Sequence, residues 1–335
     1  MAPLRISVLD APAAALAWLG QQGTRAIAAL VFIGIAVPPI GALLRPFVTE
    51  AIFVLLCIAF LHVDPAALRN YLGRPAIALA ATAWTMLVVP ALFGVSCLAI
   101  GLPTRSSDLL LALMLQAVAS PMMAAPAFAA VMGLDATLVL VTLVASTALT
   151  PFTAPAFARA FIGPALTLSP PALGLRLFAI LVGSALVAGI LRRVVGPTFI
   201  VRYAGEIAGV NILLLFVFVA AVMENVAARF FAAPLIMLEL AVLAFVVFFV
   251  VLGVTTLVFA RMGPERALAL GLMASQRNMG LMLAATGGAL PDLAWLYFAL
   301  CQFPIYLSPQ LLKPLVQRVG GRPQVTRGPA GTPRS

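Results

Sequence analysis

Long apolar segments follow one another along almost the whole chain, and they constrain its fold more than any other feature. Of the 335 residues, 64% are hydrophobic and 9% are charged, whereas a soluble domain has about 25% charged residues. Segments of about 17 to 25 apolar residues can each cross a hydrocarbon core of about 30 Å as a helix. A β-barrel would instead show short strands of alternating polarity. The sequence therefore predicts an all-α integral membrane protein that has the lipid bilayer as its surroundings.

The apolar segments predict ten transmembrane helices, of which the fourth and the ninth are interrupted by polar or proline-bearing centres. The predicted spans are Ala26–Leu43, Phe47–Val63, Pro75–Leu102, Asp108–Val131, Ala136–Phe161, Leu173–Leu191, Ile207–Ala228, Pro234–Phe259, Ala267–Leu290 and Leu293–Leu312. Residues 1–25 contain no obvious cleavage site, and we interpret them as a cytoplasmic lead-in rather than a signal peptide. Residues 317–335 are basic and rich in glycine and proline, so we expect a disordered tail.

The basic residues indicate the topology, because alternate loops must lie on the same side of the membrane. With ten spans, the side that holds both termini collects fourteen of the 20 Lys and Arg residues, and Arg277 lies inside the ninth span. The other side has five: Arg45, Arg105, Arg159, Arg176 and Arg229. We expect the protein in the inner (plasma) membrane of the cell. By the positive-inside rule, both termini are expected on its cytoplasmic side. The net charge of +10 is thus a topology signal and does not predict nucleic-acid binding.

Ten spans divide into two repeats of five, residues 26–163 and 164–316, which would be inserted in opposite orientations because five is odd. The fourth span of each repeat should then match. The two sequences are LALMLQAVASPMMAAPAFAAVMGLD (residues 111–135) and LALGLMASQRNMGLMLAATGGALPD (residues 268–292). Pro121 and Pro126 remove backbone donors from the first. Two interrupted helices in matching places indicate a binding site at the membrane midplane of an inverted-repeat transporter, although small residues can also serve close helix packing.

The centre of the ninth span holds Ser275, Gln276, Arg277 and Asn278 in a row. A guanidinium in the middle of a spanning segment costs a few kcal/mol or more unless it faces a polar interior. One hypothesis is that Arg277 binds the carboxylate of an anionic substrate, with Gln276 and Asn278 in support. The alternative is a structural ion pair with Glu224 or Glu239, because buried charges are usually paired.

The chain resembles the bile acid:sodium symporters and their bacterial and arsenite-transporting relatives. The similar pieces are FVTEAIFVLLCIAFLHVDPAAL (residues 47–68), ASPMMAAPAF with GLDATLVLVTLVASTALTP (residues 133–151), VNILLLFVFVAAVMENV (residues 210–226) and Arg277-Asn278. The resemblance implies ten helices, a core domain in which two broken helices cross, and a panel domain against which the core moves. It covers residues 25 to 315.

The resemblance also implies sodium sites, and at these positions the sequence departs from the family. A Glu and a Gln of the ninth span are replaced by Met273 and Arg277, and a Gln of the third span by Thr85, five residues before Pro90. Pro126 or Ala127 stands near a Ser-Asn pair of the fourth span, and Asp135 takes the place of the Asn that follows. Sodium needs several oxygen ligands, and Thr85, Ser120 and Asn278 do not make a full set.

The sequence as a whole predicts a secondary carrier for a small or amphipathic organic anion, working by alternating access between the two broken helices. The candidate binding residues are Ser275, Gln276, Arg277, Asn278, Ser120, Pro121, Pro126, Asp135, Thr85 and Glu224. Ser146, Thr147 and Thr150 are expected only to bond their own helix backbone. No resident cofactor or metal is expected, coupling to sodium or protons stays open, and so does the oligomeric state.

Other functions remain as alternatives: a sodium-coupled bile-acid-like symporter, a carrier of arsenite or another inorganic solute, and a non-transporting receptor. An enzyme is not expected, because the sequence has one His, no HExxH motif and no Asp inside any predicted span.

Overall fold

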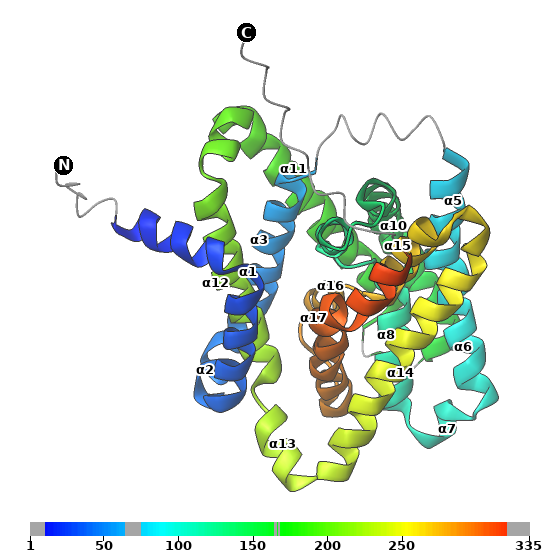
Figure 1. Ribbon diagram of the computed structural model, residues 1–335. Coiled ribbons are helices and arrows are strands. Elements are labelled where there is room, and N and C mark those ends of the chain that lie inside the picture. The colour runs from blue at the N-terminus through cyan, green and yellow to red at the C-terminus, as the bar shows by residue number, and fades with distance from the viewer. Residues whose placement is uncertain (1–10, 64–74, 164–165, 167, 320–335) are drawn as a thin grey trace, which may run out of the picture.

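The computed structural model describes residues 11–63, 75–163, 166 and 168–319, and Figure 1 shows a bundle of helices. No strand is found in the described part of the chain. Within the described ranges, six helices are long and apolar enough to cross a membrane, judged by length and composition. They span Pro38–Leu61, Ala76–Ala99, Ala136–Ile162, Pro170–Arg202, Ala204–Ala232 and Pro234–Val258. For the described residues, the prediction of an all-α chain with several helices able to span a membrane is confirmed.

The first two predicted spans have a different boundary in the structure. Helix α1 (Ala11–Ala36) starts inside the predicted lead-in, and α2 (Pro38–Leu44) follows after Val37. One helix over Ala26–Leu43 was therefore wrong, because Pro38 has no N–H for a continuing helix and the residue before a proline is driven out of the helical region. A 3₁₀ turn (Arg45–Phe47) and α3 (Val48–Leu61) continue the chain. Residues 1–10 of the predicted lead-in lie outside the described part.

The third predicted span is found as α5 (Pro75–Ala83), a π-helical segment (Trp84–Val88) and α6 (Val89–Ala99). A short helix α7 (Leu102–Arg105) leads to the fourth.

Both interruptions predicted from the sequence are present. The predicted fourth span corresponds to α8 (Ser107–Val118) and α9 (Ala125–Val131), and the predicted ninth span to α15 (Pro264–Ser275) and α16 (Met279–Ala285). Every residue from position 267 to 277 is buried. Helices that are apolar on all sides belong in the centre of a bundle, and this is where the interrupted helices lie.

The remaining helices surround this centre. They are α10 (Ala136–Phe157) with a π-helical end (Ala158–Ile162), α11 (Pro170–Arg202), α12 (Ala204–Met223), α13 (Val226–Ala232), α14 (Pro234–Val258) and α17 (Asp292–Val319). Helix α17 extends to Val319 and takes in the first residues of the predicted tail, while residues 320–335 lie outside the described part.

Two groups of helices are seen in Figure 1, with α1, α3 and α12 on one side and α8, α14, α15 and α17 on the other. Helix α12 packs along α1, α2 and α3, and α15 packs along α14. Gly271 makes the second contact possible, because a Cβ atom there would overlap Thr256 Oγ1 and lie 2.7 Å from the carbonyl oxygen of Leu252.

Candidate functional site

The two helix interruptions meet and pair through their backbones. Pro121 and Arg277 form an antiparallel bridge. The N–H of Met122 donates to the carbonyl of Gln276 at 2.8 Å, and the N–H of Asn278 donates to the carbonyl of Ser120 at 2.8 Å. Backbone polar groups inside a membrane must be satisfied within the protein. The pairing therefore explains how two broken helices can be accommodated at the centre of the bundle.

Arg277 projects from this pairing into a buried place, where it is 3% exposed. Its Nη1 donates to the carbonyl of Ala119 at 3.0 Å, and Nη1 and Nη2 both donate to the carbonyl of Thr85 at 3.3 and 3.2 Å. No carboxylate of the described residues forms an ion pair with it. The structural ion pair expected as an alternative is therefore wrong: Glu224 pairs with Arg45, and Glu239 is exposed on α14.

The carbonyl of Thr85 is free for Arg277 because of a proline. In the π-helical segment, the N–H of Val89 donates to the carbonyl of Trp84, five residues back. The next bond of that pattern would come from residue 90, but Pro90 has no N–H. The carbonyl of Ala119 likewise follows the last turn of α8, in extended backbone. Arg277 thus supplies donors to two carbonyls that their own helices leave without one.

Neutral carbonyls hydrogen-bond the guanidinium, yet they do not cancel its charge. At an effective dielectric constant of 20, a carboxylate about 6 to 8 Å away gains about 2 to 3 kcal/mol from one positive charge. The interior beside Arg277 is therefore electrostatically suited to an anion.

A cavity of about 400 Å³ lies against the paired interruptions. Arg277 and Asn278 line it together with residues of α3, α12 and α17. Most of its wall is apolar, as at Leu56 and Phe218. The other polar lining residues are His62, Asn211, Gln302 and Tyr306. An apolar cavity with a few polar groups at one wall fits an amphipathic ligand.

Most of the predicted site residues are gathered at the crossing. The Ser275 hydroxyl donates to the carbonyl of Leu272 at 2.8 Å, and Gln276 Nε2 donates to Ser308 Oγ at 2.8 Å. Asn278 caps α16, because its Oδ1 accepts from the N–H of Leu281 at 3.0 Å. Pro126 lies in the first turn of α9. Of these residues, only Arg277 and Asn278 line the cavity.

Two predicted site residues lie elsewhere. Asp135 caps α10 by accepting from the N–H of Leu138 at 2.9 Å, and it pairs with Arg266 at 3.3 Å. Glu224 stands at the far end of α12 beside Arg45. Neither residue lines the cavity, and each carboxylate is paired with an arginine other than Arg277. Their carboxylates have structural partners that the sequence did not reveal.

Several buried side-chain oxygens have no hydrogen-bond partner among the residues that the structure describes. Three belong to predicted site residues: Thr85 Oγ1, Ser120 Oγ and Gln276 Oε1. Four more are the hydroxyls of Thr82, Thr142, Ser146 and Thr147. The expectation that α10 hydroxyls bond their own backbone holds for Thr150, which donates to the carbonyl of Ser146 at 2.9 Å. It is wrong for Ser146 and Thr147. Within the described ranges, no three His, Cys, Asp or Glu side chains gather as a metal site.

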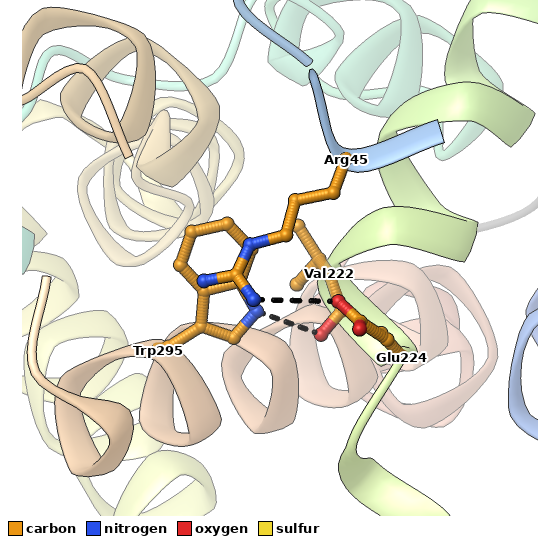
Figure 2. Close-up of polar contacts among 4 residues, drawn as sticks. All are labelled: Arg45, Val222, Glu224 and Trp295. Carbon is orange, nitrogen blue, oxygen red and sulfur yellow. Dashed lines mark hydrogen bonds and ion pairs between the residues drawn. The ribbon is translucent and has the colours of Figure 1, made fainter. Parts of the chain in front are cut away.

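A second cluster joins Arg45, Glu224 and Trp295 at the C-terminal end of α12 (Figure 2). Arg45 Nη1 lies 3.5 Å from Glu224 Oε2, and the Arg45 guanidinium stacks 4.6 Å from the ring centre of Trp295. The indole N–H of Trp295 donates to the carbonyl of Val222 at 3.2 Å. The lining residues of α3 and α12 lie between positions 52 and 62 and between 208 and 218. Arg45 precedes α3 and Glu224 follows α12, so the cluster lies past the last cavity-lining residues of both helices.

No protein-family model matches the chain, and no curated protein matches it. The resemblance to the bile acid:sodium symporters therefore stays a prediction that rests on the motifs.

Proposed function

We propose that this protein is a secondary transporter that moves an amphipathic organic anion across a membrane by alternating access. In this proposal the chain has ten membrane segments in two inverted repeats, with the interrupted helices at corresponding places. The observation that carries it is the pairing of two helix interruptions around a buried arginine that has no acidic partner among the described residues, at the wall of a cavity. Transporters commonly place their binding sites at such interruptions.

Arg277 supplies a fixed charge in this mechanism. Three of its five N–H groups are directed at carbonyls. In this proposal it attracts the substrate mainly through its field. The carboxylate would lie near Asn278, which is partly exposed at the cavity wall. The apolar body of the substrate would lie along α3 and α12. An anion gains most from a fixed charge where water is scarce.

Alternating access needs two ends that open in turn. In this proposal they are the end of α3 and α12 beside the cavity and the end beside the cluster. The distribution of arginines assigns the end with His62 and Ala208 to the cytoplasmic side. The cavity at this end then faces the cytoplasm, and the cluster of Arg45, Glu224 and Trp295 closes the external end. Transport would require this cluster to separate.

The test is anion uptake by the purified protein in proteoliposomes. A thermal-shift screen first identifies an anion that binds, because a ligand of the native state raises apparent stability by mass action. Radiolabelled benzoate and cholate are suitable first probes, since they share a carboxylate and differ in apolar body. We expect saturable uptake above that of empty liposomes, and accelerated exchange when unlabelled anion is inside. Binding without any flux would identify a receptor and contradict the proposal.

A sodium-coupled carrier is the second candidate, and one observation favours it. The unpartnered oxygens of Thr85, Ser120 and Gln276 are buried beside the interruptions. Oxygen atoms are the ligands that hard cations prefer. Against this candidate stands Arg277, because its positive charge in the same region disfavours a second cation. Sodium replacement distinguishes the two mechanisms.

A further inference from the structure

A second, smaller pocket lies beside the cluster at the closed end. Its volume is about 280 Å³, and Arg45, Thr49, Leu283, Gly287 and Trp295 are among its lining residues. An engineered cavity of about 150 Å³ holds a benzene molecule. The pocket is therefore large enough for a ligand with one ring and a small polar group.

Positive charge exceeds negative charge around this pocket. Arg45 lines it, and Arg176 lies at its edge, because Arg176 Nη1 would be 3.0 Å from a Cβ atom at Gly287. Glu224 is the one carboxylate that pairs with either arginine among the described residues. Glu50 is exposed on α3 and does not line the pocket.

Arg45 is held in a way that leaves hydrogen-bonding capacity. Its contact with Glu224 joins one nitrogen to one oxygen at 3.5 Å, and its side chain is 45% exposed, against 16% for Glu224. The face of the guanidinium rests on Trp295, which is 6% exposed. Stacking uses the face of a guanidinium, whereas hydrogen bonds use its edge. Arg45 can therefore bind a carboxylate with two parallel bonds while it remains stacked.

We propose that this pocket is an anion-binding site for an organic carboxylate, in which the ligand displaces Glu224 from Arg45 and places its apolar part in the pocket beside Leu283 and the edge of Trp295. The proposal rests on the carrier function and specifies where the substrate binds at the external end. Because Trp295 bridges the two groups of helices through Val222 and Arg45, a ligand here contacts the residues that must separate when that end opens. Arg176 adds long-range attraction from the rim.

The test is a titration of the purified full-length protein with benzoate, monitored by tryptophan fluorescence. Benzamide is the matched neutral control of the same size. We expect a saturable change with benzoate and none with benzamide. Trp295→Phe should remove the signal and identify the reporter among the three tryptophans. Arg45→Gln should weaken binding by about tenfold or more, because hydrogen bonds to a charged group are lost. Arg105→Gln, an arginine that does not line the pocket, should have no effect.

Glu224→Gln provides a test by gain of affinity, which a misfolded variant cannot imitate. It removes the competing carboxylate, so benzoate should bind severalfold more tightly. Equal responses to benzoate and benzamide, unchanged affinity in Arg45→Gln or Glu224→Gln, or no saturation at about 10 mM benzoate would each overturn the proposal. The titration needs no flux. If uptake occurs and the titration fails, this site alone is refuted; if benzoate binds and no anion is transported, the carrier function is refuted.

Discussion

Replacing Arg277 by glutamine separates the electrostatic role of this residue from its structural one. The change removes the charge and shortens the side chain, so the carbonyls of Thr85 and Ala119 lose their donors. Two unsatisfied buried carbonyls cost about 1 to 3 kcal/mol each. Removing the buried charge also removes its desolvation penalty of several kcal/mol, which stabilises the folded protein. These terms largely cancel, and we expect a small change in melting temperature.

The affinity for the anion should change far more than the melting temperature. A loss of about 2 to 3 kcal/mol of attraction corresponds to an affinity about 30- to 150-fold lower. Arg277→Lys keeps the charge and should stay within about tenfold of the wild type. The assay is isothermal titration of the anion found by thermal shift, with melting temperatures measured in parallel.

Arg192→Gln is the matched control for Arg277→Gln. Arg192 also donates to a backbone carbonyl, that of Val63 at 2.7 Å, but it neither contacts the interruptions nor lines the cavity. Its replacement should leave affinity unchanged. If folded Arg277→Gln binds the anion within about threefold of the wild type, the fixed charge contributes less than about 1 kcal/mol and the reasoning is refuted.

Three other predictions concern packing, the π-helical segment and the closed end. Gly271→Ala should lower stability by about 1 to 3 kcal/mol through overpacking, whereas Gly253→Ala, with open space around it, should not; chemical denaturation measures both. Pro90→Ala supplies the missing N–H, which can then bond the carbonyl of Thr85 in place of Arg277. The melting temperature should not fall, but anion uptake should. Unchanged uptake would contradict the role of the free Thr85 carbonyl. In a Met123→Cys variant that also carries Trp295→Ala, the new cysteine should react with a membrane-impermeant maleimide added from outside. A lack of labelling would show that the cluster of Arg45, Glu224 and Trp295 does not close the external end.

The features that the sequence predicted are those that follow from local chemistry. Pro121 and the polar residues around Arg277 interrupt apolar helices, and a membrane requires such interruptions to be satisfied inside the protein. Their meeting followed from this requirement. The first helix boundary was misplaced because the apolar run continues through Pro38, whereas the helix itself ends before this proline.

The partners of the charged residues were not predictable in the same way. Arg277 binds backbone carbonyls, and residue types do not reveal which carbonyls are free. Pro90, five residues after Thr85, was nevertheless a usable signal that the carbonyl of Thr85 lacks a donor. Glu224 meets Arg45, 179 positions away in the sequence, because α2 packs closely on α12. Such packing depends on three-dimensional contacts, for example at Gly41, where a Cβ atom would lie 2.5 Å from the carbonyl of Ala220.

The central claim is that Arg277 provides the positive charge for binding an anion, and sodium replacement in proteoliposomes tests it most directly. Initial uptake of the identified anion is measured with equal concentrations of sodium or choline on both sides of the membrane. We expect equal uptake in the two buffers for the wild type, and strongly reduced uptake in both for Arg277→Gln. Strict dependence of wild-type uptake on sodium would contradict the claim, and it would assign the unpartnered oxygens of Thr85, Ser120 and Gln276 to a cation instead.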